Sequence, residues 1–221
     1  MDLRLPETDL VIFDCDGVLV DSEALSCRCL SEALGRVGIE MSTERALELF
    51  LGRSTAAVLD YCRAAGQPLP ATFLPDLALQ VRETFQSQLK PIPDVAAVLA
   101  ELRLPHCVAS SSDLERVRFS LELTGLATYF GQRLYTSQMV ARGKPAPDLF
   151  LHAANLMGAE PRRTLVIEDS SSGVLAAKAA GMKVWGFVGG AHYRLRDAGG
   201  LLRQAGADRI FAAMTDFWTK G

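Results

Sequence analysis

The sequence predicts an α/β protein with a parallel sheet flanked by helices and one inserted, all-helical segment. Short apolar runs bounded by turn residues recur along the chain and alternate with segments of helical hydrophobic periodicity. This alternation is typical of a parallel sheet covered on both faces. One long stretch, residues 20–89, breaks the alternation because it contains helical patterns and no convincing strand.

The first predicted strand covers residues 9–14, with the sequence DLVIFD. It runs into FDCDGVLVDSE, so Asp14 and Asp16 directly follow a buried apolar run. Unpaired charge in such a place costs free energy. Aspartate is also favoured at helix N-caps and in turns, and for this motif taken alone that local interpretation stays open.

Residues 20–89 form the inserted segment. Four amphipathic helix patterns are expected in it, at residues 23–37, 43–51, 55–65 and 74–89. Gly38 and Gly52 separate three of them, and KPIP at residues 90–93 marks the return to the main fold. The predicted domains are therefore a core, residues 1–19 and 90–221, and a helical domain, residues 20–89.

The rest of the core is predicted as four further strands with helices between them. The strands are expected at residues 106–111, 133–137, 164–169 and 183–188. The helices are expected at residues 95–102, 114–123, 147–157 and 173–180. Gly181 supplies a C-cap signal for the last of these helices.

Polar side chains are expected to gather at the carboxyl ends of the strands, because ligands bind along that edge of an α/β sheet. Two acidic pairs stand there, Asp14 with Asp16 and Glu168 with Asp169. Brought together, they would repel each other and take up protons unless a cation lay between them. Carboxylate oxygens that leave room for water and phosphate suit Mg²⁺.

A lysine and a serine cluster complete this set. Lys144 lies in GKP, where the following proline biases its backbone toward an extended form. Ser110 ends the second strand, and Ser111, Ser112 or Asp113 is expected to cap the next helix, whose start could also cradle a phosphate. Carboxylates, a hydroxyl, an ammonium group and Mg²⁺ together favour phosphoryl transfer over other chemistries.

In order and spacing, four segments resemble the motifs of the haloacid dehalogenase superfamily of phosphatases and phosphomutases. They are FDCDGVLVDSE, VASSS, GKPAPDLF and VIEDSSSGVLAAKAAGM. The resemblance covers a Rossmann-like core, and the helical insertion is similar in position and size to that family's C1 cap. Taken together the four motifs are highly specific, whereas each alone is weak.

The resemblance implies a role for each matched residue. Asp14 would be the nucleophile that takes the phosphoryl group and also a ligand of Mg²⁺. Asp16 would be the general acid and base, with its backbone carbonyl on the same ion. Asp169 would bind the metal, and Glu168 would bind it directly or through water. Ser110, Ser111 and Lys144 would hold the phosphoryl oxygens.

The same resemblance separates branches of the family. Dehalogenases lack an aspartate at the position of Asp16, which argues against that activity. Beta-phosphoglucomutases carry a histidine where this chain has Ser26, and a cap arginine where it has Thr55, with the arginine moved here to Arg53. DSEALSCR is more similar to the sugar-phosphate and 6-phosphogluconate phosphatases. We therefore expect a phosphatase, with a phosphomutase as the alternative and a non-catalytic sugar-phosphate-binding protein as a more remote one.

Substrate selection is expected to lie in the helical segment, which would close over the leaving group. The candidate residues are Arg53, Ser54 and Glu23, with an exposed arginine after a C-cap glycine as the alternative for the first. His192, in the loop GGAHYR, is expected to face solvent, with a place near the mouth of the site as the alternative.

Composition limits the partners. A net charge of -3 gives no basic field of the kind that nucleic-acid binding needs, and no apolar run is long enough to span a membrane. The five cysteines are odd in number and scattered, which indicates a reducing compartment. We expect a cytoplasmic protein that is a monomer, with a dimer as the alternative, and that acts on a small phosphorylated molecule without nucleic-acid or membrane partners.

Overall fold

The computed structural model describes residues 5, 7–53, 56–195 and 199–219. Its centre is a six-stranded sheet in the order β3-β2-β1-β4-β5-β6, and every neighbouring pair is parallel. The strands are β1 (Leu10–Phe13), β2 (His106–Ser110), β3 (Leu134–Thr136), β4 (Thr164–Glu168), β5 (Lys183–Phe187) and β6 (Arg209–Phe211). The predicted fold class is confirmed.

The first five strands lie where the hydrophobic runs predicted them, with ends that differ by a residue or two. The sixth strand, β6, was not predicted. It has only three residues, RIF, and pairs with β5 at the edge of the sheet. So short a run carries no alternating pattern of its own, and its pairing partner identifies it as a strand.

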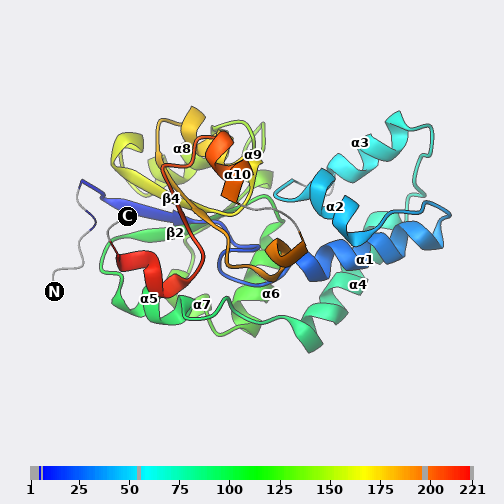
Figure 1. Cartoon of the computed structure of the whole chain (residues 1–221), viewed down its shortest axis with the longest axis horizontal. Coiled ribbons are helices and arrows are strands. Elements are labelled where there is room, and N and C mark those ends of the chain that lie inside the picture. Colours follow the sequence, from blue (N-terminus) through cyan, green and yellow to red (C-terminus); the bar gives the residue numbers. More distant parts are fainter. Residues whose placement is uncertain (1–4, 6, 54–55, 196–198, 220–221) are drawn as a thin grey trace.

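Helices cover both faces of the sheet (Figure 1). On one face, α5 (Val95–Glu101), α6 (Leu114–Leu123) and α7 (Ala127–Phe130) pack on a core that includes Val11 and Phe13 of β1. On the other, α8 (Asp148–Leu156), α9 (Ser171–Ala179) and α10 (Gly199–Gln204) pack on Leu10 and Ile12. Alternate residues of β1 thus serve opposite cores, which explains why its whole run is apolar.

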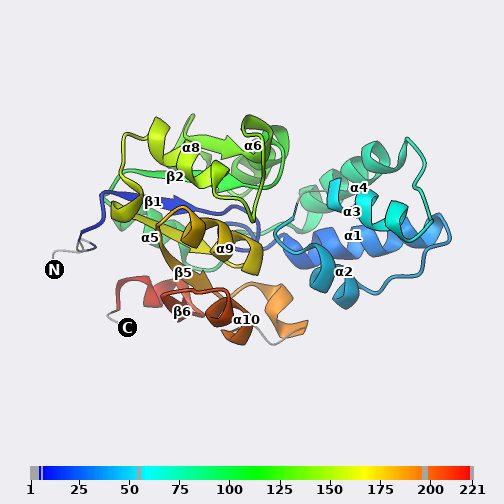
Figure 2. The same cartoon turned by 90° about the horizontal axis from the view of Figure 1, so that it is seen from above.

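The inserted segment forms α1 (Glu23–Arg36), α2 (Thr43–Phe50), α3 (Ala56–Ala64) and α4 (Phe73–Gln88). These helices stand together at one end of the molecule, on the right in Figure 2. They share their own apolar cluster, which includes Leu34, Leu47 and Phe85. We call this group of helices the cap. Its exact boundaries as a domain, residues 20 and 89, stay a prediction.

Two chain segments join the cap to the core and run side by side. Asp21 donates its backbone N–H to the carbonyl of Lys90, and Ile92 donates to Leu19, each at 2.9 Å. Val20 also forms an isolated bridge with Pro91. The paired segments bring the start of α1 next to the residues that follow β1.

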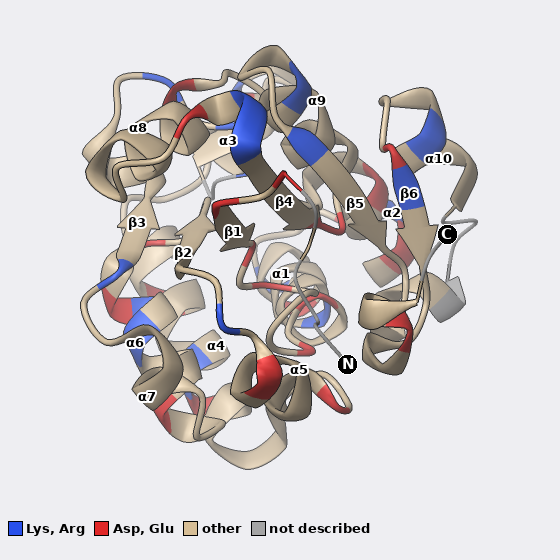
Figure 3. Ribbon diagram, turned by 90° about the vertical axis from the view of Figure 1, so that its left-hand side faces the viewer, with Lys and Arg blue, Asp and Glu red and all other residues tan. Residues whose placement is uncertain are grey.

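Four 3-10 turns complete the described structure: η1 (Ser137–Met139), η2 (Pro161–Arg163), η3 (Ala191–Leu195) and η4 (Met214–Trp218). Basic and acidic positions are interspersed over the outer helices (Figure 3). Among the described helices, none has both the length and the apolar character that crossing a bilayer requires.

Candidate active site

Strand register brings the polar strand ends together. Phe13 of β1 pairs with Val108 of β2 and with Ile167 of β4. Asp14 therefore leaves the sheet beside the ends of both neighbouring strands, at Ser110 and Glu168. The sequence motifs, far apart along the chain, meet at one point for this reason.

Lys144 is the cation at the centre of this point. Its Nζ donates to Oδ1 of Asp14 at 2.8 Å, to Oε1 of Glu168 at 2.5 Å and to the carbonyl of Ala109 at 3.0 Å. The side chains of Lys144, Asp14 and Glu168 are all buried. Burial would lower the pKa of Lys144, but the two carboxylates outweigh it and raise that pKa, so the ammonium stays charged.

Three buried carboxylates share the site. Oxygens of Asp14, Glu168 and Asp169 all lie within 4.8 Å of one another. Burial and the neighbouring carboxylates raise the pKa of Asp14 and of Asp169 well above the usual range, against the effect of Lys144. One ammonium group is therefore too little positive charge for three carboxylates, and the cluster fits a divalent cation with oxygen ligands.

The three carboxylates are not equally free to bind a cation. Both oxygens of Glu168 accept hydrogen bonds: Oε1 from Lys144, and Oε2 from the backbone N–H and the hydroxyl of Ser170, each at 2.9 Å. Oδ1 of Asp169, by contrast, is buried and accepts no hydrogen bond from the described residues. Asp169 thus has an oxygen that no described residue engages, whereas both oxygens of Glu168 are engaged.

Gly17 and His192 pack closely against Asp169. A Cβ atom on Gly17, whose φ is +75°, would lie 1.8 Å from Oδ2 of Asp169, so only glycine fits there. The expectation that His192 faces solvent is wrong: its side chain is fully buried, and Nε2 lies 3.1 Å from the same Oδ2. Asp21 holds the loop in place by accepting from the backbone N–H of Ala191 at 2.9 Å.

Asp16 lies close by, but other donors engage its carboxylate. Oδ1 accepts from the hydroxyl of Ser22 at 2.6 Å and from Nη2 of Arg116 at 2.9 Å, and Oδ2 accepts from the hydroxyl of Ser112 at 2.7 Å. Burial alone would raise the pKa of Asp16. The charge of Arg116 and these hydrogen bonds outweigh burial and lower it.

The serines at the end of β2 and just after it make different contacts. Ser110 is buried and accepts from the backbone N–H of Ser112 at 3.1 Å. Ser111 instead donates to the carbonyl of Gly52 in the cap at 3.1 Å. Of the three residues predicted as possible caps of α6, Asp113 is the N-cap, and its carboxylate accepts from the backbone N–H of Arg116 at 2.8 Å.

A cavity of about 980 Å³ extends from these residues into the cap. Its floor includes Asp14, Asp16 and Ser110, and its cap side includes Glu23 and Arg53. Burial and the charges of Asp16 and Asp169 raise the pKa of Glu23 from 4.5 to about 8. Arg53 is exposed and donates to the carbonyl of Leu49 at 3.4 Å. The third cap candidate, Ser54, lies outside the described residues.

Sequence reasoning missed Arg116, which also lines this cavity. The sequence alone offers one signal for it: the N-cap at Asp113 places Arg116 in the first turn of a helix that starts at the predicted site.

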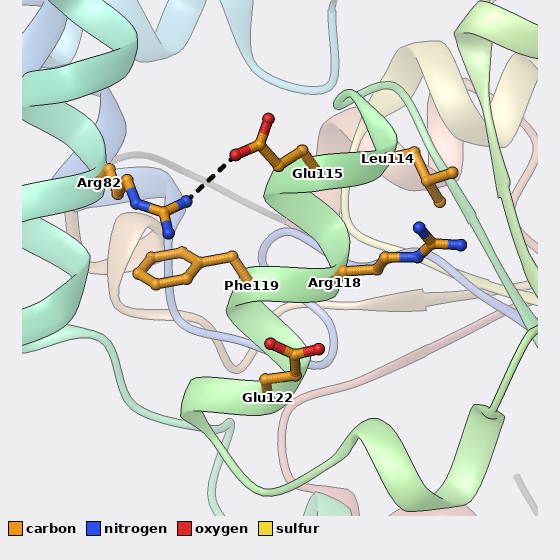
Figure 4. Close-up of a pocket in the computed structure, with 6 residues that line it drawn as sticks. All are labelled: Arg82, Leu114, Glu115, Arg118, Phe119 and Glu122. Atoms are coloured by element: carbon orange, nitrogen blue, oxygen red, sulfur yellow. Dashed lines mark hydrogen bonds and ion pairs between the residues drawn. The ribbon is translucent and has the colours of Figure 1, made fainter.

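A second, shallower pocket lies beside α6 and the cap helix α4 (Figure 4). Arg82 of α4 lies 4.1 Å from the ring centroid of Phe119 and 3.4 Å from the carboxylate of Glu115. None of the strand-end residues lines this pocket, which lies where the cap contacts the core.

The chain is similar in sequence to several known proteins. The sequence profile described as haloacid dehalogenase-like hydrolase matches residues 11–187. The 6-phosphogluconate phosphatase of Escherichia coli is 29% identical over 186 residues, which cover 83% of this chain and 84% of that protein. The fructose-1-phosphate phosphatase of the same organism is 30% identical over 176 residues, 78% of this chain and 92% of its own.

The fold has solved counterparts as well. A haloacid dehalogenase-like protein of unknown function from Agrobacterium tumefaciens superposes with a TM-score of 0.81 at 36% identity. The match covers 95% of this chain and 96% of that one.

Proposed function

Because the chain belongs to the haloacid dehalogenase-like hydrolase family and is a phosphoric monoester hydrolase, we propose that it hydrolyses a small phosphorylated sugar or sugar acid with Mg²⁺. The observation that carries the proposal is the meeting of Asp14, Lys144 and Asp169 at the ends of three different chain segments. A nucleophile, a phosphate-binding cation and a metal ligand are the parts that phosphoryl transfer needs.

In the first step an oxygen of Asp14 attacks phosphorus and the ester P–O bond breaks. The leaving oxygen takes a proton from the carboxyl group of Asp16, which must hold that proton when the ester breaks although its contacts lower its pKa in the substrate-free protein. Asp14 then carries the phosphoryl group. In the second step a water molecule attacks phosphorus and gives a proton to Asp16. The bond between Asp14 and phosphorus then breaks, which releases inorganic phosphate and restores both aspartates.

Lys144 would contact the phosphoryl oxygens from its position beside Asp14, and Ser110 would donate its hydroxyl to them. Lys144 is held in place before substrate arrives by its bonds to Asp14, Glu168 and Ala109. The hydroxyl of Ser110 accepts from the backbone N–H of Ser112. Such preorganised donors stabilise the charge that develops in the transition state.

Asp14 and Asp169, with the backbone carbonyl of Asp16, would hold Mg²⁺, and Glu168 would reach it through water because its own oxygens are already engaged. The ion would neutralise charge on the phosphoryl group and offset the repulsion between the carboxylates. The raised pKa values of Asp14 and Asp169 support this assignment.

The cap would select the leaving group, as the cavity between cap and core suggests. Glu23 could accept hydrogen bonds from hydroxyl groups of a sugar or sugar acid. Arg53 could donate to its hydroxyl or carboxylate groups.

A phosphomutase is the alternative function for the same core. Ser26, which bonds Arg116 and the carbonyl of Ser22, gives that alternative no acid or base at the position.

The proposal is tested by phosphate release from 4-nitrophenyl phosphate and a panel of sugar phosphates, with and without Mg²⁺. Asp14→Asn should abolish release, while Asp148→Asn, a partly exposed aspartate paired with Arg142, should not. Unchanged release in Asp14→Asn would refute the assignment of the nucleophile. Conversion of a hexose 1-phosphate into its 6-phosphate isomer without free phosphate would favour the mutase.

A further inference from the structure

Arg116 links three parts of the molecule around the proposed acid and base. Its Nη2 donates to Oδ1 of Asp16 in the core and to the hydroxyl of Ser26 in cap helix α1, each at 2.9 Å. Its guanidinium carbon lies 5.0 Å from the ring centroid of Phe85 in cap helix α4. One side chain of α6 thus contacts Asp16 and two helices of the cap.

Arg116 is held both at its backbone and at the tip of its side chain. At the backbone, the carboxylate of Asp113 caps α6 and accepts from the N–H of Arg116 at 2.8 Å. At the tip, the side chain is 23% exposed, which leaves it accessible from the cavity but not free in solvent. A planar cation stacked near an aromatic ring and bonded to a carboxylate loses few alternative orientations on binding.

The contacts of Asp16 are those of a carboxylate held at a fixed angle. Arg116 and Ser22 donate to one oxygen, and Ser112 donates to the other. Ser22 is the N-cap residue of α1, so α1 contacts Asp16 directly at its start. Arg116 adds a second link to the same helix, one turn further along, through the hydroxyl of Ser26. Movement of α1 would therefore displace Ser26, which accepts a hydrogen bond from the guanidinium of Arg116.

We propose that Arg116 is the positioning residue of Asp16 and ties the orientation of the acid and base to the seating of cap helix α1. This inference rests on the function proposed above, since it concerns the proton that Asp16 gives to the leaving oxygen and later takes from water. Arg116 itself contacts neither phosphorus nor the leaving oxygen in this role.

The chemistry of the two steps makes the role measurable. With an aryl ester such as 4-nitrophenyl phosphate, the leaving nitrophenolate is stable and needs no proton, so the first step is insensitive to Asp16. With an alkyl ester such as 6-phosphogluconate, the leaving oxygen needs the proton. The second step needs Asp16 as base for either ester.

In Arg116→Ala we therefore expect a burst. The first turnover of 4-nitrophenyl phosphate should stay within about threefold of wild type, while the steady rate falls at least about tenfold. With 6-phosphogluconate, the first turnover itself should fall at least about tenfold, with KM changed less than kcat. Stopped-flow absorbance of nitrophenolate and quench-flow measurement of gluconate release follow the first step for the two esters. Steady-state phosphate release measures the full turnover.

Matched variants separate positioning from damage to the fold. Arg118→Ala, on the same helix with an exposed side chain that bonds Gln132, should behave as wild type. Arg116→Lys should recover part of the rate of the second step that Arg116→Ala loses. Ser26→Ala should show a weaker burst than Arg116→Ala, because it removes only the hydrogen bond between Arg116 and the cap. If Arg116→Ala does not fold, the last two variants decide the question.

The proposal is overturned if Arg116→Lys and Ser26→Ala both keep wild-type rates in both phases. It is also overturned if Arg116→Ala loses the first aryl turnover as fully as the steady rate. Failure of the wild-type protein to release phosphate from either ester would instead refute the proposed function, so the two failures are distinguishable.

Discussion

The ammonium of Lys144 lies 2.8 Å from Oδ1 of Asp14, although the two residues are 130 positions apart in the sequence. Both side chains are almost inaccessible to solvent. A lysine placed this way holds the proposed nucleophile and balances part of the charge of three carboxylates. The site depends on it for both geometry and stability.

Lys144→Met should abolish most activity and destabilise the fold. Removing the cation leaves Asp14 and Glu168 buried without it, which costs about 3 kcal/mol of unfolding free energy, and kcat should fall at least about 100-fold. Lys178→Met is the control, because Lys178 is also ion-paired, with Asp208, but is exposed. Urea unfolding and phosphate release measure both effects, and equal losses in the two variants would contradict the assignment.

Gly17→Ala should weaken Mg²⁺ binding by displacing Asp169. The added Cβ would lie 1.8 Å from Oδ2 of Asp169, at a φ of +75°. Gly158→Ala has the same backbone strain at φ +68° with no atom within 4 Å, so it should lose only about 1 to 2 kcal/mol of stability. Calorimetric titration with Mg²⁺ compares the two. Equal Mg²⁺ affinity in both variants would show that the close approach does not matter.

His192→Leu should lower Mg²⁺ affinity about 10- to 100-fold, because the imidazole lies 3.1 Å from the carboxylate of Asp169 and would orient it. His152→Leu is the control, since that ring lies on α8 and packs on Tyr135. The measurement is the Mg²⁺ dependence of phosphate release, together with calorimetric titration. Unchanged affinity in His192→Leu would assign the buried histidine to packing alone.

Glu23 should make the fold less stable as pH rises. Burial raises its pKa from 4.5 to about 8, so between these values the folded state binds more protons than the unfolded state, and stability falls with rising pH. Glu23→Gln removes this dependence, and its stability relative to wild type should grow by on the order of 3 kcal/mol from about pH 5 to about pH 8.

The test is urea unfolding at both pH values in metal-free buffer. Glu32→Gln, an exposed change on the same helix, is the control and should leave the wild-type pH dependence intact. A constant difference between Glu23→Gln and wild type would contradict the raised pKa of Glu23.

The sequence by itself determined the sheet and the chemistry at its edge. Five of the six strands followed from apolar runs, because a strand buried on both faces needs such a run. Asp14, Ser110, Glu168 and Asp169 followed from their place at strand ends, since the carboxyl ends of neighbouring parallel strands meet. These features are local, so a local pattern predicts them.

Only the tertiary structure decided the surroundings of these residues. Strand β6 exists through its pairing with β5, and burial of His192 comes from the loop that Asp21 holds over Asp169. Arg116 reaches Asp16 across 100 positions of sequence, and its partner Ser26 belongs to the cap. Such contacts depend on how distant segments pack, and no periodicity or motif of the chain encodes which exposed-looking side chain becomes buried.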